Sequence, residues 1–89
     1  MKAVITVLGK DKPGIIYHVS HILFQSNINI LDISQTTMGD IFTMIMLVDI
    51  SQSSTTLDNL IQQFKVLEKE EHLSISTQHE DIFSSMHRI

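Results

Sequence analysis

The sequence contains no cysteine, which excludes disulfide bonds, cysteine-ligated zinc and thiol catalysis. Basic residues are few and scattered, with six Lys and Arg against ten Asp and Glu and a net charge of −4. Without a basic stripe for a phosphate backbone, we expect no direct nucleic-acid binding. No apolar run approaches the roughly 20 residues of a membrane helix, and no signal peptide precedes the first strand-like run. We therefore expect a cytoplasmic protein without membrane contact.

The chain is short enough to form only one domain. A chain of 89 residues buries only roughly 60–65% of its unfolded surface, so its margin of stability is small. Hydrophobic residues nevertheless make up 43% of the chain, and its mean hydropathy is +0.15. We expect self-association to cover part of this apolar surface.

The first half of the chain predicts a strand, a turn and a helix. Residues 3–8 form a buried, β-branched run. Pro13 favours a first helical turn, and Asp11 lies at a candidate N-cap position. Over residues 14–26 the apolar side chains recur at helical spacing: Ile15, Ile16, Val19, Ile22 and Leu23. Asn27 follows, and asparagine tolerates the left-handed conformation that ends many helices.

The second half predicts a hairpin, a second helix and a last strand. Residues 28–37 and 41–50 are strand-like, with Gly39 in the turn between them. The next helix has its apolar residues at helical spacing: Leu57, Leu60, Ile61, Phe64 and Leu67. Residues 72–80 alternate like an exposed or edge strand. The βαββαβ order predicts an α+β, ferredoxin-like domain over residues 1–80, with a four-stranded antiparallel sheet and two helices on one face.

The two strands expected at the centre of the sheet are apolar on both faces. One face would carry Ala3, Ile5, Val7, Phe42, Met44, Met46 and Val48, and the other Val4, Leu8, Ile41, Ile45, Leu47 and Ile50. With the helices on one face only, the second face requires a cover. Residues 81–89 form a tail with four apolar residues: Ile82, Phe83, Met86 and Ile89. We expect a short amphipathic helix that docks on its own domain or on the partner subunit.

The histidines and serines do not form a pattern typical of a metal or catalytic site. His18 and His21 lie one turn apart on the first predicted helix, but zinc requires three or four ligands and no spacing supplies the others. We interpret the pair as polar surface or as interface contacts. Because a nucleophile–base pattern is also missing, we expect no metal, no cofactor and no catalysis.

The turn that precedes the first helix has the features of a small binding site. Gly14 opens the helix without a side chain, so the N–H groups of Gly14, Ile15 and Ile16 are available at the positive end of the helix dipole. That arrangement suits a carboxylate. The alternative is that Pro13 and Gly14 only form a tight strand-to-helix turn, and both interpretations fit these residues.

Residues 4–16, VITVLGKDKPGII, resemble the strand, Asp-(Arg/Lys)-Pro-Gly turn and helix that open ACT domains. Residues 27–30, Asn-Ile-Asn-Ile, are similar to the Gly-Val-Asn-Ile entry to the second ACT strand. Residues 40–49 resemble the third strand of the ACT domain in the glycine-cleavage transcriptional repressor, and formyltetrahydrofolate deformylase has a similar domain. The resemblance covers nearly the whole chain, which looks like the short, standalone ACT proteins of bacteria.

The resemblance implies a homodimeric regulatory module that binds a small molecule, often an amino acid. In serine-regulated ACT domains the ligand lies between the first turn of one subunit and the second-strand entry of its neighbour. Carried over by position, the ligand-binding residues would be Asp11, Lys12, Pro13, Gly14 and Ile15 on one wall, and Asn29 and Ile30 of the partner subunit on the other. Gly9 and Asp11 replace a histidine and an asparagine of the serine-binding type, which argues against serine as the ligand.

Two functions are compatible with this resemblance. The first is a homodimer that senses an amino acid or a similar metabolite. The second is a ligand-independent protein–protein interaction module whose partner is a regulatory or metabolic protein. One exposed helix end contributes roughly 0.3–1 kcal/mol, whereas micromolar affinity requires about 8 kcal/mol. Ligand binding would therefore require the second wall that a dimer supplies.

Overall fold

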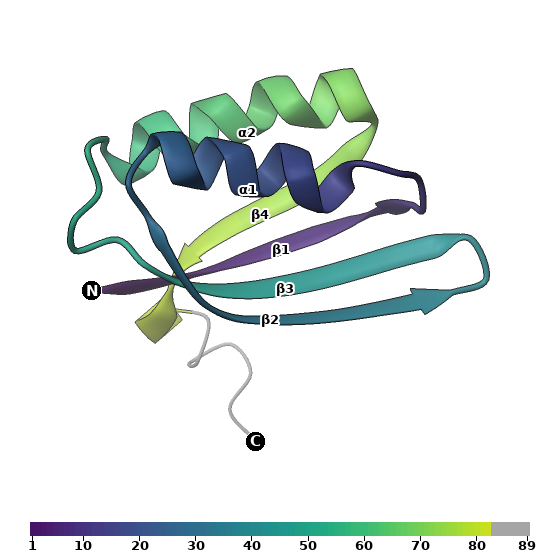
Figure 1. The fold of residues 1–89 in the computed structure, drawn as a ribbon, viewed down its shortest axis with the longest axis horizontal. Helices are drawn as coiled ribbons and strands as arrows, with labels where there is room; N and C mark the ends of the chain where they lie inside the picture. Colours follow the sequence, from purple (N-terminus) through teal and green to yellow (C-terminus); the bar gives the residue numbers. More distant parts are fainter. Residues whose placement is uncertain (83–89) are drawn as a thin grey trace.

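The computed structural model describes residues 1–82 as a βαββαβ fold (Figure 1). Its elements are β1 (Lys2–Lys10), α1 (Ile15–Gln25), β2 (Asn29–Met38), β3 (Ile41–Asp49), α2 (Leu57–Glu71) and β4 (Leu73–His79). The strands follow the order β2-β3-β1-β4, and all neighbours are antiparallel. The predicted ferredoxin-like fold is therefore confirmed, with β1 and β3 at its centre and β4 at an edge.

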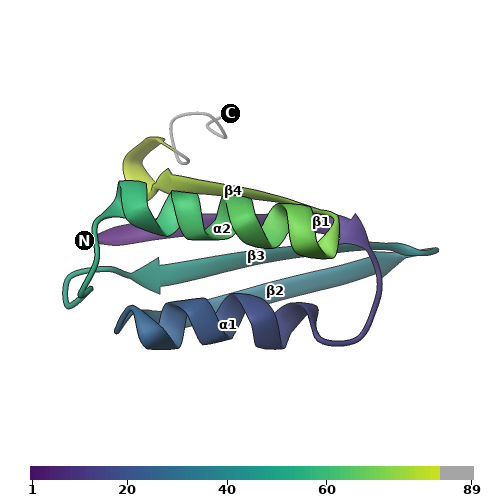
Figure 2. The same cartoon turned by 90° about the horizontal axis from the view of Figure 1, so that it is seen from above.

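The core lies between the sheet and the two helices, which both cover one face (Figures 1 and 2). In Figure 2, α1 lies on the β2 side of the sheet and α2 on the β4 side. The sheet contributes the predicted apolar set, namely Ala3, Ile5, Val7, Phe42, Met44, Met46 and Val48, and the helices contribute Ile15, Val19, Leu23, Leu60, Phe64 and Leu67. Apart from Ala3, each such side chain stabilises the fold by about 1.5–3 kcal/mol through burial.

The helix ends follow from local side-chain chemistry, with one difference from the prediction. Asn27 takes the expected left-handed conformation after α1, with φ 57°. At the start of that helix the N-cap residue is Gly14, so the prediction that Asp11 caps it is wrong. The physical reason is reach, because an N-cap side chain accepts an N–H two or three residues further on. From Asp11 those positions are Pro13, which has no N–H, and Gly14, which still precedes the helix.

The face of the sheet opposite the helices carries the second apolar set that the alternation predicts. Its members on β1 and β3 are Val4, Leu8, Ile41, Ile45 and Leu47. Ile50 was expected there but lies beyond the end of β3, where it packs against the helix-side core. The predicted tail comprises residues 81–89, and all but its first two residues lie outside the described part of the chain, so its docking stays a prediction.

Candidate functional site

The turn at residues 11–14 joins β1 to α1 and is anchored by backbone hydrogen bonds. The N–H of Asp11 donates to the carbonyl oxygen of Asp40 at 2.7 Å, which ties the turn to the β2–β3 hairpin loop. Gly14 has φ 90°, a left-handed conformation that costs a residue with a Cβ about 1–2 kcal/mol. The turn therefore requires glycine at position 14 for its own conformation, whatever it binds.

The N-terminus of α1 presents unpaired backbone donors. The first intrahelical bond runs from the N–H of His18 to the carbonyl of Gly14 at 3.0 Å, so the three preceding N–H groups have no partner within the helix. Among the described residues no side chain caps this end, and its first turn contains no acidic residue. These N–H groups and the helix dipole create a local positive potential.

A hollow of about 410 Å³ lies beside this helix end. Its lining residues come from the turn, α1, β2 and β3: Asp11, Lys12, Gly14, Ile15, Ile16, Gln35, Thr37 and Phe42. Its volume lies within the range of small-molecule pockets, roughly 300–1,000 Å³. The structure thus brings together four of the predicted residues of the first wall. It adds Gln35 and Thr37, whose side chains supply polar groups that the sequence analysis did not identify.

Lys12 ties the turn to the C-terminal end of α2. Its Nζ donates to the carbonyl oxygen of Glu71 and lies 3.4 Å from Glu71 Oε1. His18 Nε2 approaches the same Oε1 at 3.7 Å. A cation at the carboxyl end of a helix also interacts favourably with the helix dipole. Lys12 therefore holds the turn against the end of α2, and its ammonium group forms an ion pair with the carboxylate of Glu71.

The remaining predicted residues lie elsewhere. Pro13 is an exposed residue of the turn outside the lining of the hollow. Asn29 pairs with Asp49, which pairs with Lys2, at the opposite end of the sheet from Lys10. Eight residues along β1 separate the two ends by roughly 26 Å. Ile30 packs against the core near the same end as Asn29. Within one chain the two predicted walls therefore do not meet.

A second, smaller hollow lies at the Asn29 end of the molecule. It has a volume of about 320 Å³ and is lined by Phe24, Asn27, Ile28, Asn29 and Gln52. Asn27 Nδ2 donates to the carbonyl of Gln52 at 2.9 Å, which fixes one side of this hollow. The ring of Phe24 is 80% exposed beside it. The chain therefore has one concave surface at each end of β2.

The histidines of α1 contact an aromatic ring rather than each other. His18 meets Tyr17 edge-on at 5.4 Å between ring centroids, and His21 stacks on Tyr17 at 5.6 Å. Within residues 1–82, groups of three or more His, Cys, Asp or Glu that could hold a metal ion do not occur. Over the same residues, neither helix is long and apolar enough to cross a membrane.

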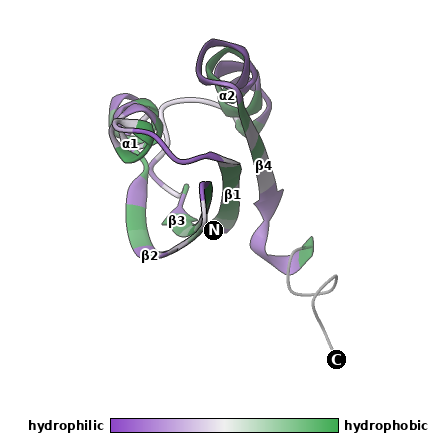
Figure 3. Ribbon diagram, turned by 90° about the vertical axis from the view of Figure 1, so that its right-hand side faces the viewer, coloured by the Kyte–Doolittle hydropathy of each residue, from purple (hydrophilic) through white to green (hydrophobic). Residues whose placement is uncertain are grey.

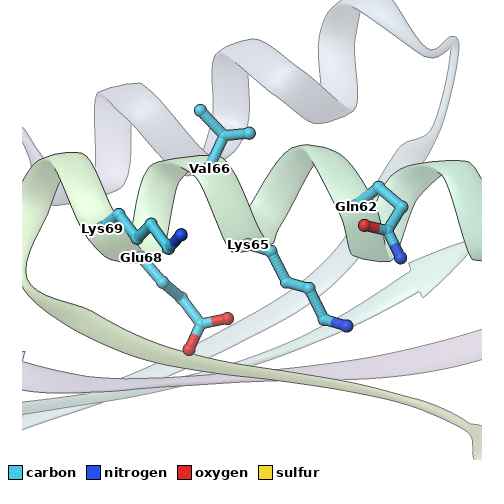
Figure 4. Close-up of a pocket in the computed structure, with 5 residues that line it drawn as sticks. All are labelled: Gln62, Lys65, Val66, Glu68 and Lys69. Carbon is cyan, nitrogen blue, oxygen red and sulfur yellow. The ribbon is translucent and has the colours of Figure 1, made fainter.

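A third hollow runs along the outer surface of α2 (Figure 4). It also measures about 410 Å³, but its lining residues all come from one helix: Gln62, Lys65, Val66, Glu68 and Lys69. A single helix surface offers no second wall to exclude water from a ligand. The hollow beside residues 11–14 is the better candidate, because four elements converge on it.

Comparison with known proteins supports the family indicated by these features. The ACT domain family matches residues 2–78. A UPF0237 protein of Clostridium perfringens is 60% identical over all 89 residues of both chains, and one of Methanococcus maripaludis is 52% identical over 97% of this chain and 96% of its own. An ACT domain protein from Streptococcus pneumoniae has 38% identity and a TM-score of 0.80 over 93% of each chain.

A more distant neighbour places the same fold within a regulatory protein. The structure of a putative glycine cleavage system transcriptional repressor has 26% identity and a TM-score of 0.73, and it matches 89% of this chain and 47% of its own. ACT domains are regulatory ligand-binding modules, and the match extends over the turn, both helices and all four strands described above. The chain therefore belongs to the ACT domain family.

Proposed function

We propose that two copies of this chain pair through their β2 edges, and that an amino acid or a similar small metabolite binds in the crevices formed between them. β2 is an edge strand, and every residue from 31 to 38 is exposed. Leu31 and Ile33 are 43% and 41% exposed on this strand. A long exposed edge with apolar side chains is a template for pairing with another strand.

Helix α1 extends the same surface. It runs beside β2 in Figure 2 and carries three exposed apolar side chains. Ile16 is 39% exposed, Tyr17 64% and Phe24 80%. Aromatic residues are enriched at protein interfaces because their large apolar surface loses little conformational entropy on burial. An interface that buries both the β2 edge and these side chains of α1 would cover most of the exposed apolar side chains on the β2 side of the molecule.

The positions of the two hollows carry the proposal. A two-fold axis through the middle of β2, near Ile33, pairs the strands in antiparallel orientation. The Asn29 end of the partner subunit then lies beside the Met38 end of the first subunit, which is where residues 11–14 and their hollow are found. Two walls roughly 26 Å apart in one chain would meet across the interface.

The chemistry of the first wall fits a zwitterion. The free N–H groups of the first turn of α1 and the helix dipole favour a carboxylate. The carboxylate of Asp11 favours an ammonium group, and Ile15 and Ile16 offer apolar contact to a side chain. Gln35 and Thr37 add hydrogen-bonding groups. An amino acid presents all three of these chemical features in a small volume.

A second candidate function is a protein–protein interaction module that needs no ligand. The exposure of Tyr17 and Phe24 favours it, because large aromatic side chains are frequent binding hot spots. In that case the surface of α1 and β2 would bind a regulatory or metabolic protein instead of a second copy.

Light scattering combined with a thermal-shift screen of the amino acids tests the proposal. We expect a dimer, and we expect one or a few amino acids to raise the melting temperature, because a ligand specific for the folded state stabilises it by mass action. At 100 times its Kd a ligand contributes about 2.7 kcal/mol, which corresponds to roughly 11–22 °C for a domain of this size. A dimer with a flat response to every amino acid would contradict ligand binding and favour the second candidate.

Two matched pairs of variants sharpen this screen. Asp11→Asn should reduce the ligand-induced shift, whereas Asp58→Asn removes the same charge in the first turn of α2 and should leave the shift unchanged. Ile33→Lys should produce a monomer and abolish the shift, because a charge at the centre of an edge strand opposes pairing. Ser76→Lys, on the edge strand β4, is its control. A monomeric Ile33→Lys variant that keeps the full ligand response would contradict the shared site.

A further inference from the structure

The face of the sheet opposite the helices carries an apolar surface that neither proposed function uses. We call its members on the two central strands, Val4, Leu8, Ile41, Ile45 and Leu47, the open-face patch. Met38 of β2, which pairs with Ile41 and is 74% exposed, adjoins the patch on the same face. Figure 3 colours the ribbon by hydropathy and shows hydrophobic stretches in the central strands β1 and β3. Because neither α1 nor α2 covers this face, the patch requires another partner if it is to leave water.

The exposure of the open-face patch changes from one end to the other. Val4 is only 5% exposed, although it lies outside the helix-side core cluster. Its neighbour Leu47 is half-buried, whereas Ile45 is 38% exposed. At the far end, Leu8 and Ile41 are 45% and 47% exposed. Cover is therefore greatest at the end of the patch where β1 begins.

The chain leaves β4 at this covered end. His79, the last residue of β4, pairs with Ala3, the neighbour of Val4. Residues 80–82 then form a helical turn. Figures 1 and 3 show this turn on the side of the sheet away from α1 and α2. The described chain therefore ends, at residue 82, near the end of the sheet where Val4 lies.

We propose that residues 83–89 cover the open-face patch of their own chain. Phe83, Met86 and Ile89 recur every three residues and, with Ile82, supply one apolar side. A segment of seven residues spans about 10 Å as a helix and about 23 Å when extended. Val4 and Leu8 are four residues apart, or about 13 Å along β1, so the segment is long enough to reach along the patch.

The size of the patch favours a short segment over a second copy of the sheet. Its four exposed or half-buried side chains beyond Val4 present an apolar area on the order of a few hundred Å². A stable interface between two proteins buries about 800 Å² on each partner, of which roughly 450 Å² is apolar. Three large apolar side chains match the smaller area. The tail would also leave the β2 edge free for the pairing proposed above.

Cysteine cross-linking tests this proposal directly, because the chain contains no cysteine of its own. The double variant Ile45→Cys/Met86→Cys should form an intrachain disulfide under mild oxidation at low protein concentration. Adding Phe83→Ser and Ile89→Ser should slow its formation about tenfold, because the two apolar anchors raise the local concentration of the tail at the patch. Adding Ser84→Asn and Ser85→Asn instead changes only polar positions and should leave the rate unchanged.

Three outcomes would overturn the proposal. One is a disulfide rate that does not respond to Phe83→Ser and Ile89→Ser, since random encounters do not depend on the apolar anchors. Another is the absence of a disulfide in the folded double variant. The third is an interchain disulfide as fast as the intrachain one when chains with Ile45→Cys alone are mixed with chains carrying Met86→Cys alone. Thr43→Cys, on the same face of β3, replaces Ile45→Cys if that variant does not fold.

Discussion

Replacing Gly9 by alanine tests whether the side chain of Leu73 occupies the space beside position 9. Gly9 lies in β1 directly opposite Leu73 of β4. A Cβ on residue 9 would lie 2.6 Å from Leu73 Cδ2 and 3.4 Å from the carbonyl oxygen of His72. Leu73 is 7% exposed and belongs to the core, so it must shift among packed neighbours.

The size of the effect follows from this geometry. Overpacking a core by a methyl group costs about 1–3 kcal/mol. The clashing atom is the end of a flexible side chain rather than backbone, so we expect Gly9→Ala to lower the free energy of unfolding by about 1–2 kcal/mol. For a domain of this size that loss lowers the melting temperature by roughly 4–16 °C.

A double-mutant cycle measured by urea unfolding identifies the cause. Leu73→Val shortens the side chain that meets position 9 and costs about 1 kcal/mol alone. In that background Gly9→Ala should cost less than about 0.5 kcal/mol, because the clash has been removed. If the two substitutions lower the free energy of unfolding by amounts that simply add, the side chain of Leu73 does not require glycine at position 9.

Three further predictions concern the turn, the second helix and the acid range. Gly14→Ala and its control Gly39→Ala should each cost about 1–2 kcal/mol in thermal unfolding, since both glycines have positive φ, but only the first should weaken the amino-acid response. Thr56→Ala should cost about 1 kcal/mol in urea unfolding, because Thr56 Oγ1 accepts the N–H of Asn59 at 3.1 Å and caps α2. Two hydrogen bonds from Ser51 to Asp49, one from its side chain and one from its backbone, lower the pKa of Asp49 below its ordinary value of 3.8, and the side-chain bond has the larger effect. The ionised Asp49 therefore stabilises the fold above about pH 3.8, and this contribution is lost as the pH falls through the folded-state pKa of Asp49. In unfolding curves measured at acid pH, the difference in stability between the wild type and Asp49→Asn should vanish.

Local patterns were sufficient to predict the elements but not every residue's place in them. The alternation of Phe42, Met44, Met46 and Val48 identified the core face of β3. Successive residues of a strand face opposite sides of the sheet, so the helices on one side can bury only every second residue. The bulge at Leu31, where the register of β2 against β3 shifts, left no local signal. A bulge depends on how two strands fit together, and one strand's sequence does not contain that information.

The candidate site was predicted only where it is local in sequence. The residues of the turn were found because they are consecutive, whereas Gln35, Thr37 and Phe42 join them through pairing across the sheet. The two-residue hairpin loop could have indicated part of this, since it places Thr37 opposite Phe42. The position of Phe42 opposite Gly9 follows from the pairing of β3 with β1, which that loop does not set. The contact between Gly9 and Leu73 has no such signal, because β4 reaches β1 only after the second helix.

The separation of the two hollows within one chain follows from the topology itself. β1 runs toward the turn, and the 11 residues of α1 then return about 16 Å along the sheet before β2 begins. The first turn and the entry to β2 therefore lie at opposite ends of one chain, and the proposed two-fold pairing of β2 edges would bring them together. Ligand binding and dimerisation would then be linked, so each should strengthen the other. Diluting the protein below the dissociation constant of the dimer should weaken the apparent affinity for an active amino acid, and adding that amino acid should lower the dissociation constant measured by sedimentation. An affinity that does not change with protein concentration across the monomer–dimer transition would show that each subunit binds alone, and the crevice between subunits would not be the site.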